Sequence, residues 1–61
     1  MNQVYSIINN VSKQYLRSDW EEVKGLIYTH DIELAATFNT YEEASEHQEA
    51  NEIVVSMDLY N

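Results

Sequence analysis

The chain has 61 residues and no cysteine, and its formal net charge is −8 at pH 7. This length predicts a single small domain over residues 1–61, and the lack of cysteine excludes disulfides and thiolate metal sites. The acidic balance disfavours direct binding to nucleic acid or to membranes, and no apolar run is long enough to span a bilayer. The N-terminus lacks the pattern of a secretion signal, so we expect the protein in the cytoplasm of its host cell.

The N-terminal part of the chain predicts a β-hairpin. Val4–Ile8 is rich in β-branched and aromatic residues, and Asn9-Asn10 follows it as a turn signal. The returning strand is expected over residues 14–17. Residues 26–29 fit a third strand, but Gly25 before them is equally typical of a loop or bulge. A sheet of three or four strands is therefore expected.

The middle of the chain predicts one helix. Thr40 and Glu43 have the spacing of a capping box, in which the threonine hydroxyl accepts from a helical amide and the glutamate reaches back to the cap. A helix over residues 41–50 follows, and Asn51 is its expected stop because asparagine tolerates the left-handed conformation. A short helical turn, capped by its first residue, is expected earlier, over residues 31–36.

The C-terminal segment alternates with the period of a β-strand. We expect its uniformly apolar face to pack against the helix and its mixed face to be exposed. The uniformly apolar face consists of Ile53, Val55, Met57 and Leu59. The rest of the core is expected to come from Ile7 or Ile8, Leu16, Trp20 and Phe38. These elements predict an α+β fold, in which one helix packs on one face of a small antiparallel sheet in the order ββ(β)αβ.

The negative charge is confined to the second half of the chain. Residues 1–24 hold all three bases and three acids, whereas residues 25–61 hold eight acids and no Lys or Arg. On the predicted helix, Glu42, Glu46 and Glu49 recur every three or four residues, which brings neighbouring carboxylates about 5–6 Å apart. Like charges at this spacing destabilise a helix, so we expect a reason other than helix stability for keeping them; the alternative interpretation is a solvated helix face whose first-turn acids complement the helix dipole. The candidate partner-binding residues are Glu42, Glu43, Glu46 and Glu49, with Asp31, Glu33 and Glu52 as flanking charge.

The sequence does not support catalysis or metal binding. His30 and His47 each have acids nearby, but each assembles only two ligands, whereas a zinc site needs at least three protein ligands. A chain this small can hardly enclose a substrate pocket, and a single glycine excludes a glycine-rich phosphate loop. We therefore predict no catalytic residue, no metal ligand and no cofactor, and we expect the protein not to be an enzyme.

One pattern of residues runs through most of the chain. It consists of Tyr5-x-Ile7-x-Asn9, Tyr15-Leu16, Trp20, Ala35/Ala36-x-Phe38, Thr40-x-Glu42-Glu43-Ala44 and a β-branched terminal strand. This pattern resembles a loose group of small acidic phage and prophage proteins, most of which have no assigned function. The chain departs from the group because it lacks the lysine-rich helix end that those proteins often have. The resemblance implies an origin in a mobile element and an action on host machinery, and it supplies no site residue.

Two functional hypotheses follow from these features. The first is a non-catalytic inhibitor or regulator that binds a basic surface of a host protein through its acidic face. In its sharpest form, the carboxylates imitate the phosphates of DNA and block a DNA-binding enzyme of restriction, CRISPR, repair or replication. The alternative is a structural or accessory module that assembles through its open sheet face or sheet edge, for instance as a homodimer, with the charge serving solubility only. That alternative expects exposed contacts at Val54 and Tyr60.

Overall fold

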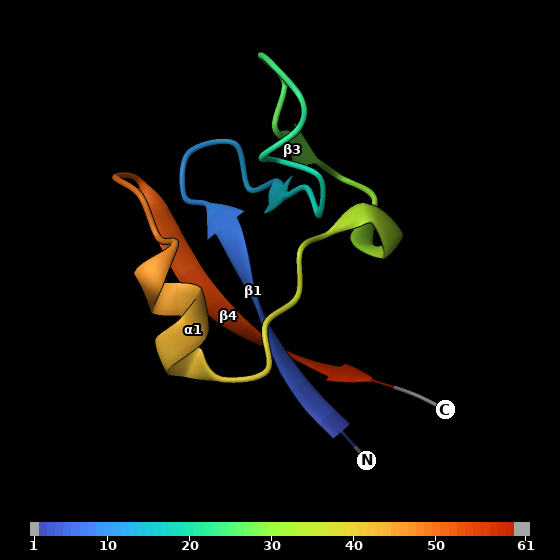
Figure 1. The fold of residues 1–61 in the computed structure, drawn as a ribbon, viewed down its shortest axis with the longest axis vertical. Coiled ribbons are helices and arrows are strands. Elements are labelled where there is room, and N and C mark those ends of the chain that lie inside the picture. The colour runs from blue at the N-terminus through green and yellow to red at the C-terminus, as the bar shows by residue number, and fades with distance from the viewer. Residues whose placement is uncertain (1, 60–61) are drawn as a thin grey trace.

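The computed structural model describes residues 2–59, and the side chains of residues 3–58. Four strands form one antiparallel sheet in the order β3-β2-β1-β4 (Figure 1). The strands are β1 (Asn2–Asn9), β2 (Tyr15–Leu16), β3 (Tyr28–Thr29) and β4 (Glu52–Leu59). A 3₁₀ helix, η1 (Ile32–Leu34), and one α-helix, α1 (Tyr41–Glu46), lie between β3 and β4. The predicted α+β fold is confirmed, and the third strand is present.

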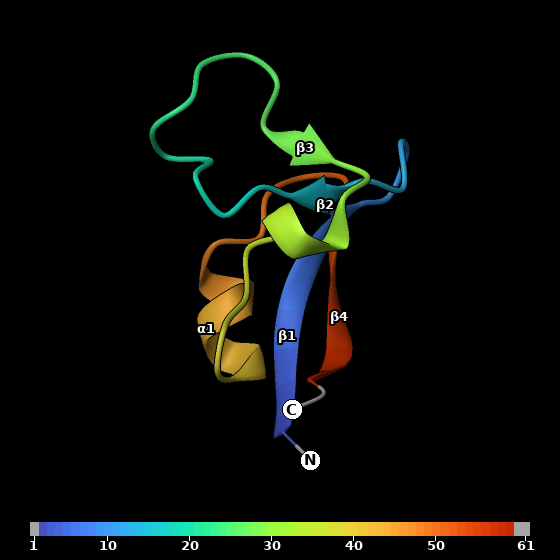
Figure 2. The same cartoon turned by 90° about the vertical axis from the view of Figure 1, so that its right-hand side faces the viewer.

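The sheet is a long two-stranded ribbon with two short strands at one end (Figure 2). β1 and β4 are paired along their full length, from Asn2 opposite Leu59 to Asn9 opposite Glu52. β2 meets β1 at a single pair, and β3 meets β2 at two. Most of the ladder hydrogen bonds therefore join the two ends of the chain, and β1 and β4 position everything else.

Asn9 builds the turn between β1 and β2. Its side-chain Oδ1 accepts hydrogen bonds from the amides of Val11 at 2.8 Å and Ser12 at 2.9 Å. Its own amide donates to the carbonyl of Gln14 at 2.8 Å, which closes the loop. Asparagine favours turns because its side chain bonds the backbone two and three residues ahead. The predicted turn and hairpin are confirmed.

The segment between η1 and α1 fills the fork where β1 and β2 diverge. The amide of Ala36 donates to the carbonyl of Leu16 in β2 at 2.8 Å. On the other side, Phe38 and Tyr5 in β1 exchange two backbone hydrogen bonds of 2.8 and 2.9 Å. The Ser6 hydroxyl, which is fully buried, donates to the carbonyl of Ala36 at 2.7 Å. This segment therefore extends the sheet on the β2 side of β1 without forming a regular strand.

The core lies between α1 and the face of the sheet that carries Ile7. Ile7 and Ala44 of α1 are both fully buried, and Leu16 is 2% exposed. A small residue at position 44 lets the short helix approach the sheet closely. The other members of the core are Ala36, Tyr5, Trp20, Ile27, Tyr28, Phe38 and Val54.

β4 presents the opposite face to the helix from the one that its sequence predicts. Val54 packs in the core, whereas Ile53 is 42% exposed. The register with β1 gives the reason, because Val54 lies opposite Ile7, and directly paired residues of two strands share a face. The prediction that Ile53, Val55 and Met57 pack against the helix is therefore wrong, as is the expected exposure of Val54. The Leu59 side chain and Tyr60 lie outside the described residues.

The helix ends four residues before the predicted position. α1 stops at Glu46, and His47 is its C-cap, so residues 48–50 belong to the turn that leads into β4. Asn51 does adopt the left-handed conformation, with φ of 66°, but it closes this turn rather than the helix. The prediction for η1 is confirmed, with a shorter range than expected. No helix in residues 2–59 is both long and apolar enough to cross a membrane.

Candidate functional site

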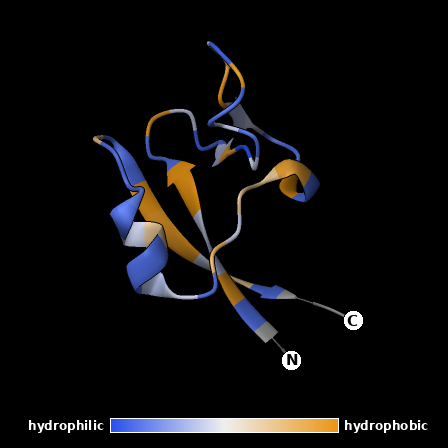
Figure 3. Cartoon of the chain, in the orientation of Figure 1, coloured by the Kyte–Doolittle hydropathy of each residue, from blue (hydrophilic) through white to orange (hydrophobic). Residues whose placement is uncertain are grey.

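The exposed side of α1 is acidic. Glu42, Glu43 and Glu46 are exposed, while Ala44 faces the sheet. Figure 3 shows the helix as mostly hydrophilic beside the apolar stretches of β1 and β4. Because residues four apart lie on the same side of a helix, the carboxylates of Glu42 and Glu46 are neighbours. Glu49 is also exposed, but it lies in the turn after α1 and does not continue this row.

Glu43 has a structural role at the start of α1. The Thr40 hydroxyl accepts a hydrogen bond from the Glu43 amide at 3.1 Å, which confirms the threonine half of the predicted capping box. The Glu43 carboxylate reaches back one residue beyond the cap and accepts from the amide of Asn39 at 3.1 Å. The helix begins at residue 41 because these two bonds satisfy amides that have no partner within the helix.

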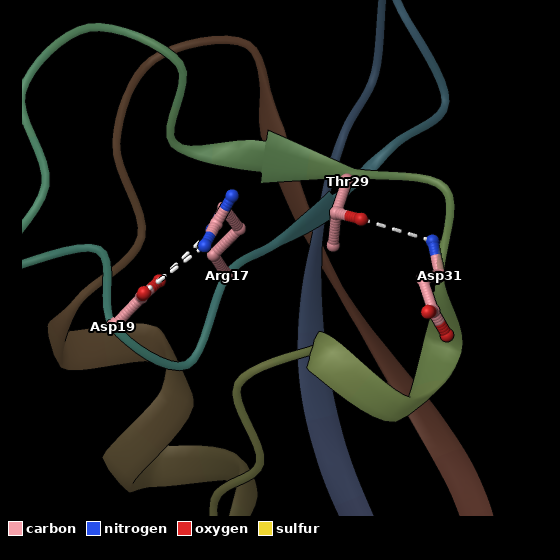
Figure 4. A network of polar contacts seen from close by, with 4 residues as sticks. All are labelled: Arg17, Asp19, Thr29 and Asp31. Carbon is pink, nitrogen blue, oxygen red and sulfur yellow. Dashed lines mark hydrogen bonds and ion pairs between the residues drawn. The ribbon is translucent and has the colours of Figure 1, made fainter.

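Asp31 has the same kind of role at the start of η1. Its carboxylate accepts from the amide of Glu33 at 3.0 Å, and its own amide donates to the Thr29 hydroxyl at 3.0 Å (Figure 4). Asp31 and Glu33 are exposed. Figure 1 shows η1 and α1 on different sides of β1, so these two acids do not join the carboxylates of the helix.

Glu52 is buried and bonded from two sides. It is 5% exposed, and one carboxylate oxygen accepts from the amide of Glu49 at 2.8 Å. The other oxygen accepts from the hydroxyl of Tyr28 in β3. Burial of the Tyr28 hydroxyl and its bond to Glu52 both raise the pKa of Tyr28. Glu52 therefore ties the start of β4 to β3, and its carboxylate is turned away from the surface to which the sequence assigns it.

Four of the seven candidate acids keep carboxylates without an internal partner among the described residues: Glu33, Glu42, Glu46 and Glu49. The one ion pair in that part of the chain joins Arg17 to Asp19 at 2.9 Å (Figure 4). The hydrogen bond from Arg17 lowers the pKa of Asp19, which is not one of the candidates. We call Glu42 and Glu46 the α1 acidic patch.

The two histidines are placed differently. His47 stacks on Phe38 with ring centroids 5.4 Å apart, and its ring centroid lies 5.7 Å from that of Trp20 in an edge-to-face arrangement. His30 is exposed. Within residues 2–59, no three His, Asp or Glu side chains are grouped as a metal site would require, and no pocket is present. No local sequence pattern predicts the contact of His47 with Trp20 or the bond between Tyr28 and Glu52, since each joins residues more than 20 positions apart.

Comparison with protein-family models, with curated proteins and with solved structures found no match.

Proposed function

We propose that this chain is a non-catalytic inhibitor or regulator that binds a basic surface of a host protein through the α1 acidic patch. The observation that carries the proposal is the pair Glu42 and Glu46, exposed one turn apart with no internal partner among the described residues. Such a like-charged pair lowers helix stability by about 0.2–0.5 kcal/mol. α1 has only six residues, so this cost falls on a short helix. Binding to a basic partner explains why the pair is kept.

The wider charge distribution supports the same kind of partner. Residues 25–61 contain no Lys or Arg, and this half of the chain includes the whole acidic patch. A single-sign surface of this kind steers oppositely charged proteins toward it and repels nucleic acid. A surface rich in Lys and Arg is therefore the chemistry that fits the patch. The resemblance to small phage and prophage proteins suggests that this surface belongs to the host of a mobile element.

Imitation of DNA is the finer form of the proposal. Glu42 and Glu46 supply two neighbouring carboxylates on the helix, and Glu49 supplies a third charge from the turn after it. A protein groove that binds DNA phosphates through Lys and Arg can accept such carboxylates instead. The target in this form is a DNA-binding enzyme, and DNA and this protein compete for the same groove.

The experiment begins with the immobilised chain and an extract of bacterial cells. The captured protein is identified, purified and tested for direct binding at increasing salt, with and without a DNA duplex. We expect binding to weaken steeply as salt rises, because the contacts are between charges. Competition by DNA would support the finer form. If a purified partner binds equally at low and high salt, the contact is not electrostatic and the proposal is wrong.

A further inference from the structure

The outer edge of β4 is an unpaired strand edge. In the sheet order β3-β2-β1-β4, β4 has β1 on one side and no other strand of the described chain on the other (Figure 2). Proteins usually protect such an edge with charges, prolines or bulges. Residues 53–57 contain no charged residue and no proline, and β4 pairs with β1 at eight consecutive positions without a bulge. Charges stand only at Glu52 and Asp58 on either side of this stretch, so the middle of the edge is a template for another strand.

The ladder with β1 determines which backbone groups of β4 point outward. Tyr5 exchanges its two backbone bonds with Phe38, on the side of β1 away from β4. The pair of Tyr5 and Ser56 is therefore a non-hydrogen-bonded pair of the β1–β4 ladder. Because bonded and non-bonded pairs alternate in an antiparallel ladder, the N–H and C=O groups of Val54, Ser56 and Asp58 point to the free edge.

Glu52, two residues before Val54, also directs its backbone N–H and C=O away from β1, but both groups already have hydrogen-bond partners within the chain. The free edge therefore begins after Glu52. The Glu52 amide donates to the carbonyl of Glu49 at 3.2 Å, and the Glu52 carbonyl accepts from the Gln48 side chain at 2.6 Å. Within the described chain, no such bond reaches the outward groups of the other three residues. The end of β4 nearest α1 is thus closed, and the edge from residue 54 onward is open.

We propose that a second copy of this chain pairs antiparallel with β4 along this open edge and forms a two-fold symmetric dimer. An antiparallel strand pair is itself two-fold symmetric, so a strand edge is complementary to its own copy. When the two-fold axis passes through Ser56, the free backbone groups of Val54, Ser56 and Asp58 can all bond to the partner strand. Ser56 then faces Ser56 of the partner subunit, and Val54 faces Asp58 of the partner subunit.

The side chains of β4 are compatible with a second copy of the chain at this edge. Both copies carry a charge of −8, so they can approach each other only along a neutral part of the surface. The stretch from Ile53 to Met57 is neutral, and Ile53, Val55 and Met57 lie partly exposed on the face away from α1. In the dimer, Val55 lies beside Met57 of the partner subunit, which extends this apolar face across the junction. This register also separates Asp58 from Asp58 of the partner subunit, which limits repulsion between the two carboxylates.

Single cysteines test the register, because the natural chain has none. In Ser56→Cys, the two cysteines face each other with Cα atoms about 5.5 Å apart, within the range of a disulfide. In the matched variant Asp58→Cys, the two cysteines are offset by four residues, or about 13 Å. Under mild oxidation we expect Ser56→Cys to form a covalent dimer at least about tenfold faster than Asp58→Cys. Equal rates would overturn the proposal.

Analytical ultracentrifugation tests the dimer itself. We expect the natural protein to sediment as a dimer whose association strengthens with salt, because salt screens the repulsion between two acidic copies. Ser56→Pro removes the outward N–H and is expected to be monomeric, whereas Ser56→Ala keeps that N–H and remains dimeric. Circular dichroism checks that both variants are folded. If the natural protein is monomeric at all accessible concentrations, the dimer proposal is wrong. That result would not bear on the proposed function, which depends on the acids of α1.

Discussion

The Ser6 hydroxyl and the Ala36 carbonyl are joined by a buried hydrogen bond of 2.7 Å, across 30 positions of the sequence. Ser6 lies in β1, and Ala36 lies in the segment that leads from η1 to α1. The bond therefore fixes the path of the chain between the two helical elements. The placement of α1, and with it the acidic patch, depends on this contact.

Substitution of Ser6 by alanine is expected to lower the free energy of unfolding by about 1–3 kcal/mol, because it leaves the Ala36 carbonyl without its donor in a buried position. Urea denaturation followed by circular dichroism measures this loss. Ser56→Ala is the matched control, since Ser56 is exposed and its hydroxyl makes no hydrogen bond among the described residues. Equal losses in the two variants would contradict the role of the Ser6 hydroxyl.

Neutralising Glu46 is expected to raise stability. Glu46→Gln removes a like charge four residues from Glu42 and a negative charge from the last turn of α1, which should raise the free energy of unfolding by about 0.2–0.5 kcal/mol. Glu43→Ala is expected to do the opposite, because it removes the bond to the Asn39 amide. Thermal denaturation of both variants gives the two signs. A loss of stability in Glu46→Gln would mean that this carboxylate has an internal role.

The stacking of His47 on Phe38 and its edge-to-face contact with Trp20 are expected to stabilise the end of α1. His47→Ala should lower the free energy of unfolding by about 0.5–1.5 kcal/mol. Trp20 is the only tryptophan of the chain, so its fluorescence reports on the same contact. His30→Ala should leave both quantities unchanged, because His30 has no aromatic ring contact among the described residues. An unchanged tryptophan spectrum in His47→Ala would argue against the stack.

The bond between Tyr28 and Glu52 is expected to make the free energy of unfolding depend on pH in the alkaline range. Burial and this bond raise the pKa of Tyr28 above its ordinary value of 10.0 in the folded protein. A raised folded-state pKa contributes stability that is complete below the unfolded-state pKa and is lost as pH rises through the folded-state value. From about pH 9 to 11, the natural protein should lose more unfolding free energy than Tyr28→Phe. Parallel losses in the two proteins would exclude the effect.

The sequence predicts the order and kind of the elements but not which face of β4 is buried. β1 has apolar residues on both faces, with Ile7 on one and Val4 and Ile8 on the other. The alternation of β4 therefore fits the sheet in either orientation. The pairing of Val54 with Ile7 decides between them, and pairing depends on the register of two strands from opposite ends of the chain.

Local sequence patterns predict the structural roles of some candidate acids but not of others. The capping roles of Asp31 and Glu43 follow from nearby residues, so the sequence indicates them directly. The burial of Glu52 depends on Tyr28, which is 24 positions away, and has no local signal. α1 ends early at His47, whose ring lies against Phe38 and Trp20, and the contact with Trp20 also has no local signal.

The measurement that tests the proposed function most directly compares two double charge reversals against the captured host protein. Glu42→Lys/Glu46→Lys changes the α1 acidic patch, and Glu21→Lys/Glu22→Lys changes exposed acids outside it. Each reversal adds two charges, so both variants move from −8 to −4 and differ only in position. We predict at least about a tenfold loss of affinity for the first variant and little change for the second. Equal affinities for the two variants would contradict the account.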